Sequence, residues 1–498
     1  MFSTSYLVPR TYSLPLPFVK RADGYAHVVK YTGLFGGVQG LTMLASIIRN
    51  KVVAVALGSV GMALIDIYNH VATLLSSLTT MGLSFSAVRS LSRLREEGDA
   101  RAVSEHIGML RSWTVWCAVL GTVLMAALSP VLSRLAFGSG ERTVALLLLS
   151  PMVGMLAITG MELAILKAMR RLKGLAAATT GSALWTLAVS VPAYVVWGQR
   201  AVVPVLLITT LGAMVAPLVV SRRVEPWRVS LWSRRVLGGV GGVVGLGVAY
   251  VVAASVGQAA ELGVRAFVVR DGSLAMEGLY CAMFTLIVSY GRFMFTTMDA
   301  DYFPRLSAQV GKRGEMSRLC SEQTEVVLLM MGPFLLLFAL LLPIVVPLLL
   351  SSGFLGIIRP TLVGLGYMYF RAAVTPIAYM PLATGDGKIY VGLETAYYVY
   401  FGAFVCVGFH FWGLMGAAMG LGASTLVEFC LLSQIYGRRY GVGLRRRAWI
   451  IFGLQGCLLA GGIIGLLLIG NRPLAIGLGI VLVGIQTGVS LHYYKRKE

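Results

Sequence analysis

The chain has 498 residues, of which 57% are hydrophobic and only 13% are charged, against roughly 25% charged residues in soluble domains. This composition excludes an ordinary soluble protein and predicts a chain whose solvent is lipid. The net charge of +21 would indicate nucleic-acid binding in a soluble protein. Here Lys and Arg lie in short loops between apolar spans, where they indicate membrane topology, so we expect no nucleic-acid partner.

Fourteen apolar stretches, each about long enough to cross a bilayer core as a helix, follow residues 1–28, which we interpret as a cytoplasmic tail and not a signal peptide. The sequence thus predicts an all-α polytopic membrane protein of about 14 transmembrane helices. The predicted spans are 29–50, 60–88, 110–137, 143–168, 174–197, 201–221, 236–264, 274–303, 325–350, 360–384, 389–411, 413–436, 448–470 and 473–494.

The distribution of positive charge predicts the orientation of these spans. Lys and Arg at the ends of spans are counted here with the adjoining loops. Numbered from a cytoplasmic N-terminus, the tails and even-numbered loops then hold 31 of the 42 Lys and Arg, the odd-numbered loops hold nine, and two, Arg292 and Arg371, lie in the middle of spans. Cytoplasmic loops carry such an excess, so both termini are expected in the cytoplasm. We interpret basic clusters such as Arg89 to Arg111 as topology determinants and assign them no chemistry.

Three sequence matches indicate an internal duplication. They are Tyr68 with Tyr280, Arg89 with Arg305 and Lys173 with Lys388, at offsets of 212, 216 and 215 residues. Six spans separate the copies, so two halves of the same orientation are expected, able to rock about a central site. We predict an N-terminal lobe at 29–224, a C-terminal lobe at 225–437, and two appended C-terminal helices at 438–498.

The six cysteines form no CxxC pair and no metal-ligand spacing, and five of them lie inside apolar spans. A small buried thiol is the ordinary interpretation of such positions. We expect no disulfide, no metal site and no cofactor.

The opening of the first half resembles oligosaccharide flippases of the Wzx type, in the superfamily that also holds multidrug and toxin extrusion (MATE) exporters and the lipid II flippase. The matching segments are Val29-Lys-Tyr-Thr-Gly-Leu-Phe-Gly-Gly-Val-Gln-Gly, Ile48-Arg49-Asn50-Lys51, Leu57-Gly58, Gly61-Met62 and Met81-Gly82-Leu83. The resemblance implies a MATE-like, V-shaped pair of six-helix lobes and alternating access. It also implies a bacterial inner membrane, and a polyprenyl-diphosphate-linked oligosaccharide as the partner, with membrane lipid and polysaccharide polymerase machinery as further candidates.

The chain departs from related branches in its first span. The lipid II flippase branch carries an Arg-Asp pair at the end of this span, whereas this chain reads Arg49-Asn50. The arginine matches and the acid does not, so the resemblance does not imply that ion pair in this chain. Multidrug exporters usually rely on an acid in span one, and this span has none between Tyr31 and Ile48.

Basic residues inside the spans are candidates for substrate binding, because an ionisable group in hydrocarbon is costly unless it faces a cavity or a partner. Arg292 and Arg371 lie in the middle of spans eight and ten, and Arg49 lies near the outer end of span one. Guanidinium binds phosphate oxygens bidentately and stays protonated, as a diphosphate site needs. Tyr367, one helical turn from Arg371, is the aromatic candidate for substrate binding. The alternative role of each arginine is pairing with a carboxylate, and the alternative role of Tyr367 is packing.

Four acids in or at the ends of spans are candidates for ion coupling. They are Asp66, Glu162, Asp299 and Glu428. Each could bind a proton or a cation during the cycle, and each could equally be a buried structural carboxylate.

The sequence thus favours a flippase for undecaprenyl-diphosphate-linked oligosaccharide, with no catalytic residues. An ion-coupled multidrug exporter of the same fold is the first alternative. A membrane polysaccharide-processing enzyme is the second, and the short outer loops, which hold no acidic pair suited to sugar chemistry, count against it.

Overall fold

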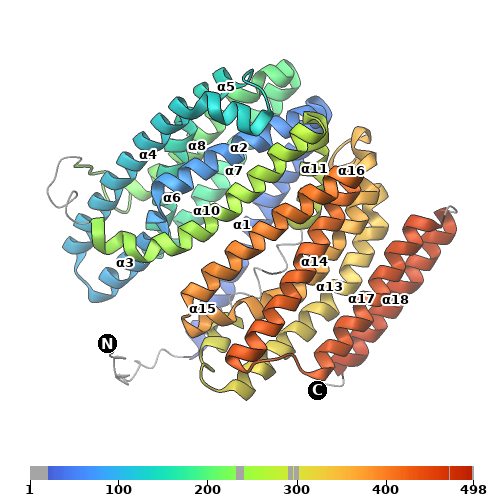
Figure 1. Ribbon diagram of the computed structural model, residues 1–498. Coiled ribbons are helices and arrows are strands. Elements are labelled where there is room, and N and C mark those ends of the chain that lie inside the picture. The colour runs from blue at the N-terminus through green and yellow to red at the C-terminus, as the bar shows by residue number, and fades with distance from the viewer. Residues whose placement is uncertain (1–20, 231–239, 290–294, 296–301, 470–471, 496–498) are drawn as a thin grey trace, which may run out of the picture.

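The computed structural model describes residues 21–230, 240–289, 295, 302–469 and 472–495, and this part of the chain is helical with no β-strand. Figure 1 shows two groups of long helices side by side, with α17 and α18 at one edge. We call α1–α8 the N-terminal lobe, α10–α16 the C-terminal lobe, and α17–α18 the C-terminal pair. The end of the molecule that carries α5 is called the upper end, and the end that carries α15 is called the lower end (Figure 1).

The N-terminal lobe begins with one long helix, and most of its later helices are separated by short turns. Its elements are α1 (Arg21–Ala56), α2 (Gly58–Thr80), α3 (Leu83–Glu97), α4 (Ala100–Phe137), α5 (Thr143–Leu148), α6 (Ser150–Ala168), α7 (Leu172–Trp197), the 3₁₀ turn η1 (Gly198–Ala201) and α8 (Val202–Arg222). Helices α2 and α3 bend by 49° at their junction, where Met81 and Gly82 adopt positive φ and end the first helix. The predicted second span is therefore a bent pair.

The C-terminal lobe and the C-terminal pair complete the chain. Their elements are α10 (Val240–Asp271), α11 (Leu274–Phe284), the π-helix η2 (Thr285–Ser289), α13 (Arg313–Leu349), the 3₁₀ turn η3 (Ser352–Ile357), α14 (Ile358–Ala378), α15 (Met380–Thr384), α16 (Gly387–Tyr440), α17 (Arg446–Leu468) and α18 (Arg472–Lys495). Helix α16 has 54 residues, far more than the roughly 20 that cross a bilayer.

Helix α16 is a hairpin of two antiparallel helices. Trp412 and Gly413 lie outside helical φ/ψ space, with Gly413 at φ 57° and ψ −140°. A Cβ atom on Gly408 would overlap the carbonyl oxygen of Gly416, and one on Gly420 would overlap that of Phe404. These close approaches pair residues at equal distances from the turn, as in a helical hairpin whose small residues let the backbones meet.

The α7–α8 hairpin turns in the same way. Gly198, which follows Trp197, has φ 55° and ψ −138°, nearly the values of Gly413 after Trp412. This φ favours glycine because a Cβ atom is strained there. A Trp-Gly pair therefore ends one helix and starts the next in both lobes.

A second feature recurs at the lower end of each lobe. The hydroxyl of Ser112 on α4 accepts a hydrogen bond of 3.0 Å from the backbone N–H of Ser230, just beyond α8. The hydroxyl of Ser321 on α13 accepts one of 2.9 Å from the backbone N–H of Arg445, just beyond α16. In each lobe, a serine side chain thus binds the backbone of the segment that follows the last helix.

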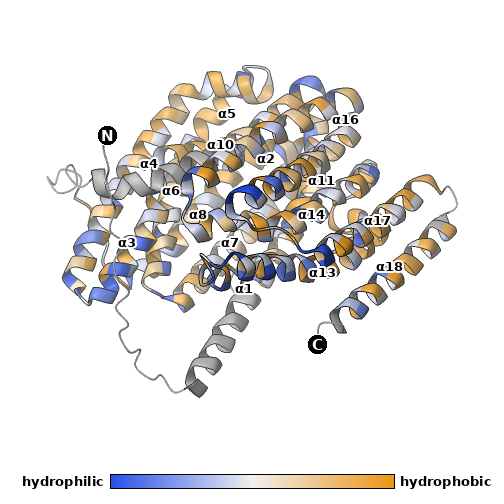
Figure 2. Cartoon of the chain, turned by 60° about the horizontal axis from the view of Figure 1, so that its bottom comes forward, coloured by the Kyte–Doolittle hydropathy of each residue, from blue (hydrophilic) through white to orange (hydrophobic). Residues whose placement is uncertain are grey.

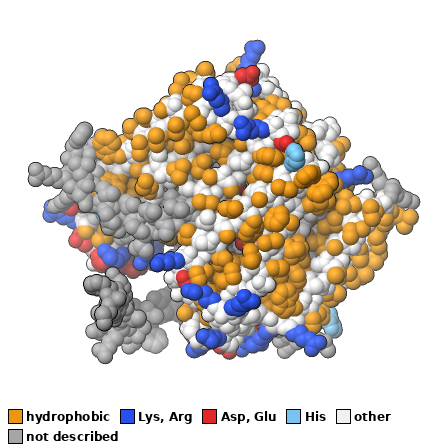
Figure 3. Space-filling model, viewed as in Figure 1, with side chains coloured by type: hydrophobic (Ala, Val, Ile, Leu, Met, Phe, Trp, Pro, Cys, Tyr) orange, Lys and Arg blue, Asp and Glu red, His pale blue; other side chains and the backbone are white. Residues whose placement is uncertain are grey.

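The surface of the bundle is suited to lipid. Among the described residues, eight helical stretches are long and apolar enough to span a membrane, or nine if the bent α2–α3 pair is one span. Two of the eight, Leu172–Arg222 and Gly387–Tyr440, are the hairpins, and α10, α14 and the shorter apolar α11 lie among them, so the described chain has the predicted all-α polytopic fold. Figure 2 shows hydrophobic residues along the helices, and Figure 3 shows apolar side chains on the outer surface, with Lys and Arg gathered mainly at the lower end.

The two lobes are joined at the upper end. Lys51 near the end of α1 donates a 2.7 Å hydrogen bond from Nζ to the carbonyl oxygen of Pro347 in α13. Ser351 donates a 3.4 Å hydrogen bond to the carbonyl oxygen of Ala54. At the start of α11, Gly278 is so close to Ser59 of α2 that a Cβ atom would overlap the Ser59 backbone. Residues of α1 and α2 are thus hydrogen-bonded to, or closely packed against, α11, α13 and Ser351 at this end.

The glycine hairpin gives a first prediction. Replacing Gly408 with Ala should lower stability by about 1–3 kcal/mol, because the added methyl overlaps the facing backbone. The matched control is Gly402→Ala in the same helix, where nothing lies within 4 Å of the added Cβ and Ala favours the helix by about 1 kcal/mol. Thermal unfolding of the purified protein in detergent measures both. Equal melting temperatures for the two variants would contradict the hairpin packing.

Candidate functional site

A cavity of about 240 Å³ lies within the C-terminal lobe, between α10, the α11–η2 segment, α14 and α16. A π-helix such as η2 inserts one extra residue per turn and is frequent at functional sites. Here Val288 of η2 forms part of the wall. The main polar and aromatic residues of the wall are Glu261, Phe284, Tyr367, Arg371, Tyr397 and Tyr398.

Arg371 is the cationic group of this cavity. It donates hydrogen bonds from Nη1 to both carboxylate oxygens of Glu428 on α16, at 3.1 and 2.8 Å. Glu428 is 6% exposed and the arginine side chain is 29% exposed, so the pair has one buried end and one end open to the cavity. Both hydrogen bonds use Nη1, so Nε and Nη2 are not engaged by Glu428. Two predicted candidates, Arg371 and Glu428, are thus partners.

Aromatic rings surround the guanidinium. The ring centroid of Tyr397 lies 5.4 Å from the Arg371 Cζ atom, within the range of a cation–π contact. Tyr398 lies edge-on to Tyr397 with 5.1 Å between the ring centroids. Tyr367, the predicted aromatic candidate, lines the same cavity as Arg371, because residues four apart lie on one helix face.

The other basic candidates do not join this cavity in the described residues. Arg49 lies in α1, and its Nε is buried with no hydrogen-bond partner among the described residues. Arg292 and the acid Asp299 lie outside the described residues, so their roles stay predictions.

Glu162 forms a buried ion pair in the N-terminal lobe. Arg111 of α4 donates from Nε to Oε1 and from Nη2 to Oε2 of Glu162, at 2.9 and 2.8 Å, and both side chains are at most 1% exposed. Arg111 also donates to the carbonyl oxygens of Glu225 and Pro226, at 3.2 and 2.9 Å, and Ser221 donates to Glu162. The pair thus ties α4 and α6 to the segment that leaves α8, a structural role.

Asp66 belongs to a charged cluster between the lobes. The Nε of Arg265 on α10 donates to its carboxylate at 2.5 Å, and Arg265 is 3% exposed. His70, Glu261 and Glu277 complete this cluster. Sequence reasoning missed Arg265 because it fell just past the predicted end of span seven, whereas α10 continues to Asp271.

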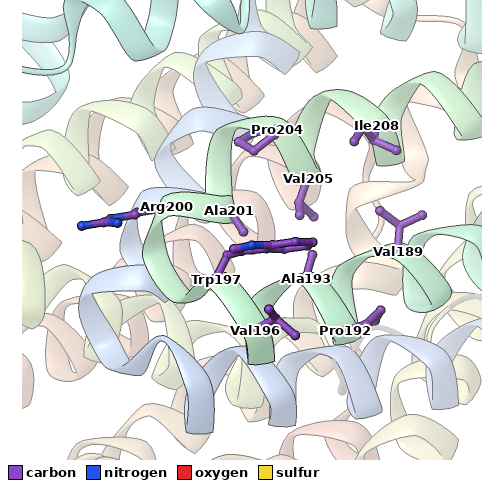
Figure 4. Close-up of a pocket in the computed structure, with 10 residues that line it drawn as sticks. All are labelled: Val189, Pro192, Ala193, Val196, Trp197, Arg200, Ala201, Pro204, Val205 and Ile208. Carbon is purple, nitrogen blue, oxygen red and sulfur yellow. The ribbon is translucent and has the colours of Figure 1, made fainter.

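A larger hollow, of about 450 Å³, lies on the α7–α8 hairpin at the upper end. Figure 4 shows the flat indole of Trp197 lying across it, with Val196, Pro192 and Val205 around the ring and Arg200 directed away from them. Among the described residues, no carboxylate lines this wall. It therefore suits an apolar contact better than a charged substrate.

The buried Arg111–Glu162 pair gives a second prediction. Glu162→Ala should lower the free energy of unfolding by about 3–5 kcal/mol, because it leaves a buried guanidinium without its counter-charge. Glu97→Ala, which removes an ion pair whose side chains are 78% and 54% exposed, is the matched control and should cost less than about 1 kcal/mol. Detergent unfolding followed by tryptophan fluorescence compares them. A Glu162 variant as stable as the Glu97 variant would rule out the structural role.

Comparisons with known proteins place the fold. No protein-family profile and no curated protein matches the sequence. Among solved structures, a "Lipid II flippase MurJ, inward closed conformation" is similar, with a TM-score of 0.69, 12% identity, 93% of this chain and 100% of that chain covered. An inward-facing multidrug resistance MATE family transporter of the MOP superfamily matches with a TM-score of 0.64, 15% identity, and 80% and 95% coverage.

An outward-facing MATE family transporter is also similar, with a TM-score of 0.55, 17% identity, and coverage of 84% of this chain and 94% of that chain. The chain therefore shares the fold of these solved structures, which confirms the predicted MATE-like fold class.

Proposed function

We propose that this protein is a flippase that moves undecaprenyl-diphosphate-linked oligosaccharide, an O-antigen or capsule repeat unit, across the bacterial inner membrane by alternating access. The observation that carries the proposal is the cavity in which Arg371 is flanked by tyrosines. The fold adds support, since one similar structure is of a protein named as a lipid II flippase. No covalent step is needed, and none is proposed.

Arg371 supplies the group that would meet the diphosphate. Its charge is permanent, and its planar fork matches the geometry of phosphate oxygens. Glu428 holds the guanidinium through Nη1 alone, which orients Nε and Nη2 without using them. The ion pair with Glu428 also compensates the charge of Arg371 when no substrate is bound.

The tyrosines supply contacts for the sugar rings. An aromatic face packs against the apolar C–H face of a sugar, while a phenol hydroxyl donates or accepts a hydrogen bond. Tyr367, Tyr397 and Tyr398 all line the cavity. Such contacts are short-ranged and adaptable, as a head group of several sugars requires.

The topology and the lobe contacts suggest the direction of transport. The excess of Lys and Arg in the even-numbered loops supports a cytoplasmic location for both termini and the lower end. The lobes meet at the opposite, outer end through Lys51 and Ser351. We infer that the head group enters between the lobes from the cytoplasm while its polyprenyl tail stays in lipid, guided by the appended α17–α18 pair.

One observation favours the alternative, an ion-coupled multidrug exporter. Glu261 lines the same cavity beside Phe284 and Phe401, and an acid among aromatic rings also suits an organic cation. Similar structures include multidrug resistance transporters. The experiment below separates the two functions.

Complementation of a bacterial strain that lacks its own oligosaccharide flippase tests the proposal. The parent chain should restore surface glycan and remove the accumulated lipid-linked intermediate. Arg371→Ala should lower export by about ten- to a hundredfold, because a charge-assisted hydrogen bond is worth about 1.5–3 kcal/mol. Arg359→Ala, which removes an exposed arginine from the same helix, is the matched control and should export normally.

Folding is controlled separately, because Arg371→Ala leaves Glu428 unpaired. The double variant Arg371→Gln with Glu428→Gln removes both charges together, and it should reach the membrane at the parent level while failing to export. Normal export by this double variant would refute the cationic site. Failure of the parent chain itself, with a gain of resistance to cationic drugs, would support the multidrug exporter instead.

A further inference from the structure

Five ionisable side chains meet where the two lobes join. Asp66 and His70 come from α2 of the N-terminal lobe, Glu261 and Arg265 from α10, and Glu277 from the first turn of α11. Charged groups inside a bundle are costly, and a cluster drawn from both lobes changes whenever the lobes separate. Its chemistry is therefore tied to the conformational cycle.

The contacts run in a line from one end of the cluster to the other. Both Glu277 and Asp66 face Nε of Arg265, at 4.0 and 2.5 Å. The other oxygen of Asp66 lies 3.4 Å from Nδ1 of His70. Nε2 of His70 lies 3.4 Å from Glu261. The order of the acid–base groups is Glu277, Asp66, His70, Glu261. Arg265 lies beside the first two through Nε, and its Nη1 lies 3.6 Å from Glu261.

Glu277 is the unusual member. It is 0% exposed, and neither carboxylate oxygen has a hydrogen-bond partner among the described residues. A buried carboxylate without hydrogen bonds is strongly disfavoured, whereas a protonated carboxyl at the same place costs far less. The guanidinium does not remove this cost, because its Nε is already engaged by Asp66 at the shorter distance.

The charge balance points the same way. Three carboxylates surround one permanent cation, Arg265, and His70 adds a second positive charge when it is protonated. With one proton on His70 and one on Glu277, two negative charges meet two positive charges, and the cluster is neutral. The other titratable groups nearby are Tyr280 and Cys281 on α11, Tyr367 on α14, and Tyr398 and Cys406 on α16, all of types that are neutral at neutral pH. The permanent cation Arg371, which is paired with Glu428, lines the same cavity as Glu261.

Exposure rises along the line toward the substrate cavity. The side chains of Glu277 and Arg265 are 0% and 3% exposed, and those of Asp66, His70 and Glu261 are 17%, 23% and 27% exposed. Glu261 lines the cavity that contains Arg371. One end of the line is thus sealed between the lobes, and the other end opens on the cavity.

We propose that this cluster is a proton site and relay, in which Glu277 holds a proton while the lobes are joined at the upper end, and Asp66, His70 and Glu261 carry it to the substrate cavity. The inference rests on the proposed transport function and names the ion that would drive it. When the lobes part, α2 leaves α10 and α11, so Glu277 meets outside water and exchanges its proton there. When they rejoin, only the protonated carboxyl is buried at low cost.

Each step moves one proton between defined atoms. The O–H bond of Glu277 breaks as an O–H bond forms on Asp66, and Glu277 becomes the carboxylate beside Arg265. Nδ1–H of His70 donates to the backbone carbonyl oxygen of Asp66 at 2.9 Å, so Nδ1 keeps its proton. Protonation of Asp66 removes the negative charge beside the His70 imidazolium, which then releases its Nε2 proton to Glu261 and from there to water in the cavity. Histidine suits this position because it gains and loses a proton near neutral pH. Arg265 stays charged throughout.

Infrared spectroscopy of the purified full-length protein in lipid vesicles tests the site without any substrate. The parent should show the C=O stretch of a protonated carboxyl at neutral pH, and Glu277→Gln should lack it. Glu325→Gln is the matched control, since Glu325 is also a buried acid of the C-terminal lobe but is paired with Arg447 at 3.4 Å. It should keep the band. A band of unchanged size in Glu277→Gln would overturn the proposal.

The relay is tested by the rate at which this band disappears after an alkaline jump. His70→Gln should slow its loss by at least about tenfold, since a positioned acid–base group contributes about 10²–10⁴-fold to proton transfer. His410→Gln, which removes a histidine 58% exposed and paired with Asp271, should leave the rate unchanged. Equal rates in the parent and His70→Gln would remove His70 from the path.

These results are independent of the transported substrate. Failed complementation together with the expected infrared results would reject the flippase and keep the proton relay. Successful complementation by the parent without a Glu277 band would keep the flippase and reject the relay.

Discussion

The structure depends on one constraint: lipid cannot solvate a charge, so a charged side chain inside the bundle must find its partner within the protein. Three arginine–carboxylate pairs meet this requirement, and each joins different helices. Arg111–Glu162 lies within the N-terminal lobe, Arg371–Glu428 within the C-terminal lobe, and Arg265–Asp66 between them. Their surroundings differ, and so do their roles. The first is sealed and structural, the second opens on a cavity, and the third can exist only while the lobes are joined at the upper end.

The same two kinds of contact hold the helices in place in both lobes. A Trp-Gly turn joins two antiparallel helices in each lobe. A serine hydroxyl near the lower end of α4 or α13 accepts a hydrogen bond from a backbone N–H of the segment that follows the last helix of the lobe. Each of these contacts involves only one or two residues, and each fixes one helix or connecting segment of a lobe against its neighbour.

Hydropathy predicted the membrane-spanning helices because a helix surface that faces lipid must be apolar. The i, i+4 spacing of Tyr367 and Arg371 correctly predicted a shared face, since helical geometry is local. The ion pairs were beyond such reasoning, because Glu428 lies 57 residues from Arg371 and Asp66 lies 199 residues from Arg265. Arg111 and Arg265 were assigned to loops because apolar composition marks the hydrocarbon core, whereas α4 and α10 continue past it. The Trp-Gly pair that occurs in both lobes was a sequence signal from which the turns at Gly198 and Gly413 could have been predicted.

The interlobe pair also bears on the energetics of opening. Separating Arg265 from Asp66 without compensation would cost about 3–5 kcal/mol, enough to keep the open state below about 1% of molecules. Water entering the gap would reduce this cost for both groups, since each then becomes solvated. Glu277 offers further compensation, because once deprotonated it can take the place of Asp66 beside Arg265 on the same lobe. Exchange of one carboxylate partner for another would keep the arginine paired in both states, and the proton on Glu277 would then decide which state is favoured.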